Sequence, residues 1–414
     1  MRPNHINRRH MLSAALAAPA LLGVRARAAG TIQMISHRYP ALELFAEKMR
    51  GAIPGVTVNT QLMPFDKAME LATIALSAKS DTPDIVYAND TMVRTFVKNG
   101  WFRPLDDLWA KYKDEFKLAD FPDAVLEPYR IDGRLYVMPH AVNAMMFFYR
   151  KDVLDKAGKA PPKTITEFRD LAKSLNTPMR AGTISCLKPI DAAMNEAHWY
   201  LNALGDGWFD KDWHPVFNNA RGVAAIETLK EVTKYAQQGF TAAANDECMI
   251  ALQQDTAAMG LQWATRAKAM DDPAKSRVVN EIDWVAPPQG HARIAGDGYA
   301  ISALSKQDPD TLFRIIATSA SQATIREAAP LIIPPRKSVL DDPEISKANR
   351  FYPAALASYE SGTRAPALPE FNAIGEFVTR RILQGVTGEQ TVKQSLDTAA
   401  AETETFLKGH GYYK

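Results

Sequence analysis

Short apolar runs alternate along the chain with longer segments in which apolar residues recur every three or four positions. The short runs predict buried strands, and the longer segments predict helices with one apolar face. Strands are expected at 31–35, 56–62 and 84–87, and helices at 42–49, 69–76 and 92–98. Three successive strand–helix pairs are typical of a parallel α/β sheet.

The segment DGRLYVMPHAVNAMMFFYRKDVL, residues 132–154, has two apolar runs in succession. We expect one strand at 135–137 and a second at 142–149. Pro139 separates the two strands, because proline has no backbone N–H to donate to a sheet. Asn143 is a single amide within the second run, just past the proline.

The α/β pattern continues over the rest of the chain. Thr164 and Glu167 form a capping box ahead of Phe168, which predicts the start of a helix. Further helices are expected at 199–204, 220–239, 309–328, 371–383 and 391–407, and further strands within TAAMGLQW, IDWV and GDGYAISAL. A chain of this length is expected to form two lobes.

The first residues have the pattern of an export signal. Asn7-Arg8-Arg9-His10-Met11-Leu12 is a twin-arginine motif, an apolar run follows at 11–24, and Ala26-Arg27-Ala28 offers a cleavage site. Because the apolar run is shorter than the roughly 20 residues of a membrane-spanning helix, residues 1–28 are predicted to be a twin-arginine (Tat) signal peptide. The expected location of the mature protein is the periplasm.

The signal also accounts for the basic balance of the full chain. Removing its five arginines lowers Lys+Arg from 49 to 44 against 47 acidic residues, a formal charge of −3. No basic block remains that favours nucleic acid or an anionic membrane surface. The two cysteines, Cys186 and Cys248, suit either one disulfide in an oxidising compartment or two buried thiols.

The sequence carries none of the common catalytic or metal-binding motifs, and its histidines lack metal-ligand spacing. Polar residues instead follow the ends of predicted strands: Ser36-His37-Arg38, Asn89-Asp90 and Gln262-Trp263. Ligands of open α/β sheets bind outside these ends. Directed hydrogen-bonding groups together with a flat tryptophan face suit a sugar, which has hydroxyl groups to pair and a C–H face to stack.

Several segments, taken in order, resemble one family over nearly the whole mature chain. They are TPDIVYAND, VKNGWFRPLDDL, DGRLYVMPHAVNAMMFFYRKDVLDKAG, PPKTITEFRDLAKSL, AMGLQWATRA, GDGYAISALSKQDPDTLFRIIATSASQ, IPPRKSV and QGVTGEQTVKQSLDTAAAE. With the export signal, they are similar to the extracellular solute-binding proteins of carbohydrate ABC transporters (family 1, maltose-binding-protein-like).

The resemblance implies an α/β, two-lobe periplasmic-binding-protein fold of type II, each lobe a mixed, mostly parallel sheet flanked by helices. The N-lobe is expected at 31–141 and 291–338, and the C-lobe at 142–290 and 339–414. The ligand would lie in the cleft between the lobes, which in this class of protein close around it by a hinge motion and deliver it to an inner-membrane permease. A monomer with no cofactor and no metal is expected.

Carried over residue by residue, the resemblance also implies a set of ligand contacts. Asn143 matches a position often filled by a carboxylate, Trp263 matches a tryptophan that stacks on sugar, and Ala88 replaces an aromatic residue. The expected contacts are Asn143, Trp263, Ser36, His37, Arg38, Asn89, Asp90, Trp199, His198, Asp297, Gly298 and Arg336. The loss of one acid and one aromatic favours a sugar smaller than a long maltodextrin, or a modified one.

Two alternatives stay open. Arg38, Arg94, Arg266 and Arg336 could line a cationic cleft for an anionic ligand such as a phosphorylated, sulfonated or uronic sugar. The chain could also be an exported glycan-cleaving enzyme, whose two carboxylates need no local motif.

Overall fold

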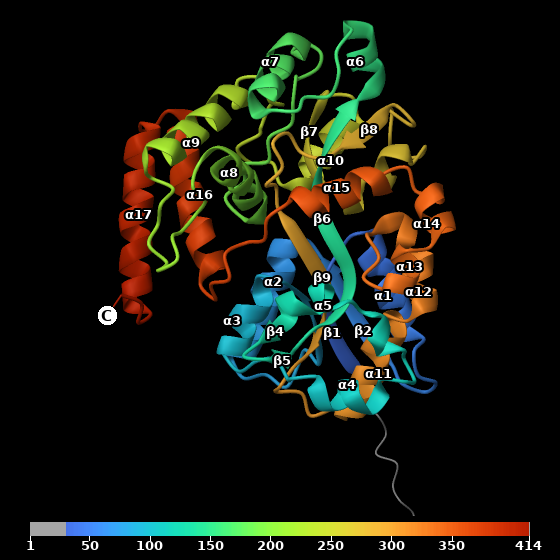
Figure 1. Ribbon diagram of the computed structural model, residues 1–414. Coiled ribbons are helices and arrows are strands. Elements are labelled where there is room, and N and C mark those ends of the chain that lie inside the picture. The colour runs from blue at the N-terminus through green and yellow to red at the C-terminus, as the bar shows by residue number, and fades with distance from the viewer. Residues whose placement is uncertain (1–29, 414) are drawn as a thin grey trace, which may run out of the picture.

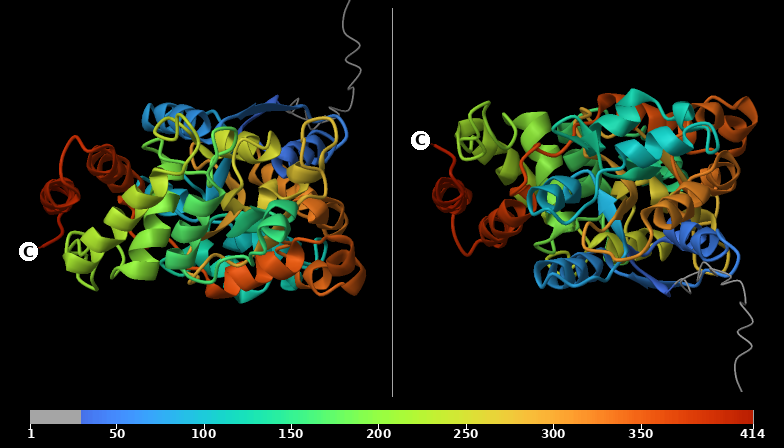
Figure 2. Two further views of the ribbon diagram at one scale, coloured as in Figure 1. Left: turned by 90° about the horizontal axis from the view of Figure 1, so that it is seen from above. Right: turned by 90° about the horizontal axis from the view of Figure 1, so that it is seen from below.

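The computed structural model describes residues 30–413, so the expected signal peptide, 1–28, lies outside the described residues. The chain forms two α/β lobes, one above the other in Figure 1, joined by strands that run between them. In the views from above and below in Figure 2, the C-terminal helix, α17 (Val392–Gly409), lies at the outer edge of the molecule. In the described part of the chain, no helix is long and apolar enough to cross a membrane.

The lower lobe in Figure 1 begins with the three strand–helix pairs that the sequence predicts. Its strands are β1 (Ile32–His37), β2 (Val58–Met63), β3 (Ile85–Asn89), β4 (Arg130–Ile131) and β5 (Arg134–Leu135). Its helices are α1 (Pro40–Arg50), α2 (Phe65–Ser77), α3 (Met92–Lys98), α4 (Asp106–Tyr112), α5 (Asp123–Leu126), α11 (Pro309–Ser319), α12 (Gln322–Ala328), α13 (Lys337–Leu340) and α14 (Pro343–Ala348). Short 3₁₀ turns lie at η1 (Leu118–Asp120), η2 (Glu127–Tyr129) and η5 (Ala329–Leu331).

The upper lobe is richer in helices. It contains α6 (Lys151–Ala157), α7 (Ile165–Leu175), α8 (Asp191–Leu204), α9 (Ala220–Thr233), α10 (Asn245–Gln253), α15 (Tyr352–Ser361), α16 (Phe371–Thr387) and α17 (Val392–Gly409). Strands β7 (Met259–Trp263) and β8 (Ile282–Val285) and the turns η3 (Ala264–Arg266) and η4 (Lys268–Asp271) complete it. Helix α7 begins as predicted, because the Thr164 side chain accepts a hydrogen bond from the Glu167 backbone N–H.

Two long strands, β6 (Met138–Arg150) and β9 (Ile294–Ile301), connect the lobes. They pair antiparallel with each other; in the lower lobe β9 pairs with β3, and in the upper lobe β6 pairs with β7 and β8. The order of the main sheet is β2-β1-β3-β9-β6-β7. Among the named strands of residues 30–413, only β1, β2 and β3 pair in parallel, so the expectation of a mostly parallel sheet holds for the lower lobe and not for the upper one.

The prediction that Pro139 separates two strands is wrong. β6 continues through the proline as one strand, and its register against β9 shifts between Pro139 and Ala141. The residue left out of the register is His140, and Pro139 is the second residue of β6, directly before it. Proline is tolerated near the start of a strand and beside such irregularities. The prediction of a single helix at 309–328 is also wrong. The segment forms two helices, α11 and α12, because Ser321 caps the start of α12.

The buried apolar side chains form separate cores. One core takes residues 32–141 together with 299–339, while the other two take residues between 142 and 295, Ile333 and residues 351–407. This separation supports the boundary at 141/142 of the lobes that we propose, 31–141 with 291–338 and 142–290 with 339–414. At the later boundaries the cores differ by a few residues, because Ala292, Ile294, Ala295 and Ile333 pack into the upper cores and Val339 packs into the lower one.

Gly298 of β9 offers a test of the close contact between the crossing strands. A Cβ atom at this position would overlap the carbonyl oxygen of Met138 and lie 2.6 Å from Val137 Cγ1. We expect Gly298→Ala to lower the free energy of unfolding by about 1–3 kcal/mol, since the overlapping atom belongs to the backbone of β6. Urea unfolding measures this loss.

Gly409→Ala is the matched control, because a Cβ atom there meets no neighbour within 4 Å. Equal stability of the two variants would contradict the tight packing of β6 on β9.

Candidate ligand-binding site

A cavity of about 350 Å³ lies between the lobes. Residues of both lobes line it: His37, Tyr39, Pro64, Phe65, Asp66, Lys67, Tyr87 and Asn89 from the lower lobe, Asn143, Arg293, Ala295 and Asp297 from the crossing strands, and Lys188, Ile190, Asp191, Ala192, Ala244, Asn245, Asp246, Glu247, Trp263, Thr265 and Arg266 from the upper lobe. Its volume is near the lower end of the ~300–1,000 Å³ found for small-molecule sites.

The cavity lies where strands end and helices begin. The ends of β1, β3 and β7 supply His37, Asn89 and Trp263, and the starts of α2, α8 and α10 face the same space. Ligand sites of α/β sheets lie beyond the carboxyl ends of strands, and helix starts offer unpaired backbone N–H groups. The sequence therefore gathers polar groups here from segments far apart in the chain.

Asp297, on the crossing strand β9, lines the cavity. Its two carboxylate oxygens accept hydrogen bonds from the hydroxyl groups of Tyr39 at 2.6 Å and Tyr87 at 2.5 Å. Burial raises the pKa of Asp297, and the two tyrosine hydrogen bonds oppose that shift. Both tyrosines are held as donors to the same carboxyl group, which fixes their rings at the cavity wall.

Both arginines of the cavity already have carboxylate partners. Arg293 donates to the two oxygens of Asp90, at 3.0 Å each, and both side chains are buried. Arg266 contacts Asp246 at 2.7 Å. The bidentate pair cancels its buried charge locally, so neither guanidinium leaves an uncompensated positive charge in the cavity.

Several polar atoms of the cavity residues have no hydrogen-bond partner within residues 30–413. They are His37 Nδ1, Asn245 Oδ1 and Arg266 Nε. Burial, with a smaller contribution from Arg266, lowers the pKa of His37 to about 4, so its ring is neutral at pH 7. Buried polar atoms of this kind are normally paired, and here they are available to a polar ligand.

Five of the twelve expected contacts line the cavity: His37, Asn89, Asn143, Trp263 and Asp297. Asn143 is held by the Thr265 hydroxyl, to which its amide donates at 3.4 Å. Trp263 stands at the end of β7, opposite Met145 of β6, and keeps 8% of its surface exposed. These five residues come from both lobes and both crossing strands.

Two of the other expected contacts lie close to the cavity without lining it. Ser36 is fully buried and bonds to Tyr299 at 3.0 Å, and Asp90 pairs with Arg293 as described. Arg38, in contrast, is exposed on the loop after β1.

The four remaining expected contacts serve the packing of the lobes. The Trp199 indole N–H donates to the carbonyl of Pro288, and both ring nitrogens of His198 are engaged, by Thr363 and Trp208. Gly298 packs against β6, and Arg336 is fully buried, with donors bonded to the carbonyls of Phe116, Lys117 and Ala320. These four residues are not part of the proposed site.

Several upper-lobe residues that line the cavity were not among the contacts expected from the sequence. They form the upper wall of the cavity. Lys188 lies just before α8, and Asp191 is the first residue of that helix. Asn245, Asp246 and Glu247 are the first three residues of α10. A cluster of three polar residues ahead of an apolar helix is a visible signal in ANDECMIAL. No local sequence pattern marks Arg293 as a cavity residue, because its place depends on its pairing with Asp90, which is 203 residues away in the chain.

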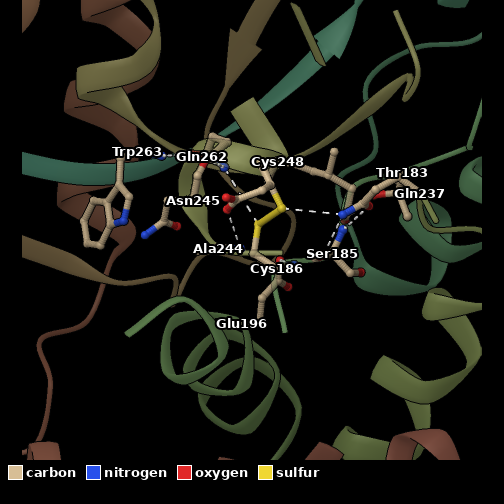
Figure 3. The surroundings of a disulfide bond; sticks show 12 residues. Thr183, Ser185, Cys186, Glu196, Gln237, Ala244, Asn245, Cys248, Gln262 and Trp263 are labelled. Carbon is tan, nitrogen blue, oxygen red and sulfur yellow. Dashed lines mark hydrogen bonds between the residues drawn. A yellow bond between two sulfur atoms is a disulfide. The ribbon is translucent and has the colours of Figure 1, made fainter. Parts of the chain in front are cut away.

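Cys186 and Cys248 form a disulfide beside this wall, so the alternative of two free thiols is excluded in the structure. Figure 3 shows Asn245, Gln262 and Trp263 on one side of the disulfide and Gln237 with Ser185 on the other. Beneath it, the Cys186 backbone N–H donates to the buried carboxyl group of Glu196 at 3.2 Å.

The model of the family described as bacterial extracellular solute-binding protein matches residues 36–319. The mannitol-binding protein of Pseudomonas aeruginosa is 24% identical over 357 residues, which cover 76% of this chain and 78% of that protein.

Solved structures agree in fold. A solute-binding protein of an ABC transporter from Agrobacterium vitis S4, with bound D-mannitol, superposes with a TM-score of 0.82 at 23% identity, covering 93% of this chain and all of that one. MalE3 of T. maritima with bound maltose gives a TM-score of 0.82 at 19% identity, covering 91% and 99% of the two chains. Both likenesses show the two-lobe fold.

Glu196 provides a test of the environment under the cavity wall. Burial raises its pKa to about 8, well above its ordinary value of 4.5. The folded state thus keeps a proton that the unfolded state releases, so the stability from this group is present below pH 4.5 and is lost as the pH rises to 8. Glu196→Gln lacks this titrating group. The difference in unfolding free energy, variant minus wild type, should therefore rise by about 3–5 kcal/mol between pH 4.5 and pH 8.

Urea unfolding of both proteins at pH 4.5, 6 and 8 measures the difference. Glu360→Gln, on the exposed face of α15, is the control and should follow the wild type at every pH. A constant gap between Glu196→Gln and the wild type would contradict a buried, protonated Glu196.

Proposed function

The chain belongs to the family of bacterial extracellular solute-binding proteins, and on that premise we propose that it binds a small, neutral sugar or polyol in the cleft between its lobes. It then delivers this ligand to the permease of an ABC importer. The mature protein acts in the periplasm as a monomer, after export through the twin-arginine pathway, and binds its ligand without chemical change.

The observation that carries the proposal is the pairing of charge in the cavity. The arginines that face it, Arg293 and Arg266, are already bound to Asp90 and Asp246. An anionic ligand would have to compete with these carboxylates. Of the four arginines that the sequence offers for a cationic cleft, only Arg266 lines the cavity. The residues therefore favour an uncharged ligand over an anionic one.

The same walls suit a ligand with many hydroxyl groups. Carboxylates such as Asp297 and Asp191 accept hydrogen bonds, while the amides of Asn89 and Asn143 both accept and donate. A hydroxyl group is donor and acceptor at once, so it pairs with either kind. Trp263 adds a flat apolar surface for the C–H face of the ligand. Sites built from directed polar groups reject ligands that leave those groups unpaired.

The relatives support this ligand class. The P. aeruginosa relative is named for mannitol, and the two solved structures hold D-mannitol and maltose. Both compounds are small and neutral. A cavity of about 350 Å³ also favours a ligand of this size over a long oligosaccharide.

Contacts across the cleft support hinge closure around the ligand. Lys188 of the upper lobe lies 3.5 Å from Asp66 of the lower lobe, at the cavity. Lys98 of α3 pairs with Glu370 at the start of α16. Such ion pairs form only when the lobes are close together. They therefore stabilise the closed state in addition to the stabilisation that the ligand provides.

A ligand screen tests the proposal directly. We expect one or more neutral compounds among D-mannitol, ribitol, common monosaccharides and maltose to raise the melting temperature of the mature protein, because a ligand that binds only the folded state stabilises it. Glycerol phosphate and glucuronate should have little effect. Calorimetry then gives the dissociation constant at two salt concentrations.

The affinity for a neutral ligand should be nearly independent of ionic strength, since no net charge is screened. Stabilisation by the anions alone, weakened by salt, would overturn the neutral class. The absence of stabilisation by any sugar or polyol would overturn the proposed function.

Two substitutions test the proposed contacts. Trp263→Ala should weaken binding about tenfold to a hundredfold, because it removes the apolar face of the site. Asn143→Ala should weaken it about tenfold, the loss of one hydrogen bond. Calorimetry with the ligand found in the screen measures both effects.

Arg38→Ala serves as the control, since Arg38 is exposed and outside the cavity lining. Its affinity should equal that of the wild type. Wild-type affinity in both Trp263→Ala and Asn143→Ala would remove these residues from the site.

A further inference from the structure

The disulfide joins two segments that both reach the cavity. Cys186 precedes α8, whose first residue is Asp191, and Cys248 lies in the first turn of α10, whose first residue is Asn245. Asp191 and Asn245 line the cavity. The cysteines themselves are 1% and 0% exposed, so the bond lies behind the wall and does not face the ligand.

Gln262 connects the same disulfide to the tryptophan of the site. Its side-chain amide donates to the backbone carbonyl of Asn245 at 3.0 Å and lies 3.8 Å from Cys186 Sγ. Gln262 is fully buried and immediately precedes Trp263 in β7. Figure 3 shows Gln262 between the disulfide and the strand that carries Trp263. Three wall elements thus meet at this side chain.

The joined segments also touch at the cavity surface. The Asn245 side-chain amide lies 3.4 Å from Asp191 Oδ2, which accepts a second hydrogen bond from Asn195 at 2.9 Å. On the far side of the disulfide, Gln237 holds both the N–H and the carbonyl of Ser185, at 2.9 Å each. The disulfide is therefore the centre of a network that ends at ligand-facing groups.

This wall has little regular structure of its own to hold it. The chain from 176 to 190 forms no helix and makes only single bridges to its neighbours, and 234–244 is a series of turns. A covalent bond between residues 62 apart limits how far such segments can separate.

From these contacts we infer that Cys186, Cys248 and Gln262 are positioning residues for ligand binding. They form a brace that fixes Asp191, Asn245 and Trp263 at the spacing that the ligand requires, and the oxidised protein is the form with full affinity. The inference rests on the proposed function and adds to it a dependence on the redox state of a bond that does not touch the ligand.

The double variant C186S/C248S tests the brace. At a temperature far below its melting point, calorimetry with D-mannitol and with maltose should show a dissociation constant about tenfold higher than in the wild type, equivalent to one lost hydrogen bond. Gln262→Met retains the disulfide and the side-chain length but cannot bond to Asn245. It should weaken binding in the same direction.

Leu396→Ala separates positioning from general stability. Leu396 is fully buried in α17, away from the cavity, so its loss lowers the melting temperature without reaching the wall. Its dissociation constant should match that of the wild type. If C186S/C248S and Gln262→Met also keep wild-type affinity while losing stability, the disulfide is structural only and the inference is overturned.

Hydrogen exchange of the ligand-free proteins supplies a readout that does not depend on the ligand. Amides of 186–191 and 245–248 should exchange faster in C186S/C248S than in the wild type, with those of β1 unchanged. If no sugar or polyol of the ligand screen binds the wild type, the proposed function fails, while this comparison of exchange rates still decides whether the brace exists. Unchanged exchange in both segments overturns it, and Gln262→Met gives the same comparison if the double variant does not fold.

Discussion

The antiparallel pairing of β6 with β9 is the constraint on which the rest of the structure depends. Ala141 pairs with Asp297 and Asn143 with Ala295, so backbone hydrogen bonds set the positions of two polar residues in the cavity. The lower lobe is attached to this ribbon through β3, and the upper lobe through β7 and β8. A shift of one residue would turn both side chains away from the cavity.

The same ribbon is consistent with the neutral ligand that we propose, because it lets the charges of the cleft balance one another. Arg293 extends from the start of β9, and its partner Asp90 follows β3, the strand that pairs with β9. The buried ion pair thus lies at the adjacent ends of two paired central strands and needs no ligand to balance it. What remains for the ligand are unpaired polar atoms, such as those of His37 and Asn245. These groups offer hydrogen bonds without requiring a countercharge.

Features that depend on local sequence could be predicted, and features that depend on distant partners could not. Strands β1 to β3 and the cap of α7 follow from short patterns, while the place of Asn143 was implied by the family resemblance. The effect of Pro139 could not be predicted, because it depends on the register of β9, which lies far away in sequence. The place of Trp199 could not be predicted either, because residues 192–201 of α8 are buried all around and their pattern does not show which side faces a cavity.

The spacing of Cys186 and Cys248 could not decide whether they pair, because only the fold brings α10 beside the segment before α8. Their pairing bears on two properties that the sequence presents separately, the predicted export signal and the proposed polar site. Disulfides persist in oxidising compartments and are rare in the cytosol. The proposed brace of the cavity wall is therefore expected to be complete in an oxidising compartment such as the periplasm, to which the predicted signal would direct the chain. Under the proposed function, export and ligand binding would both depend on this one covalent bond.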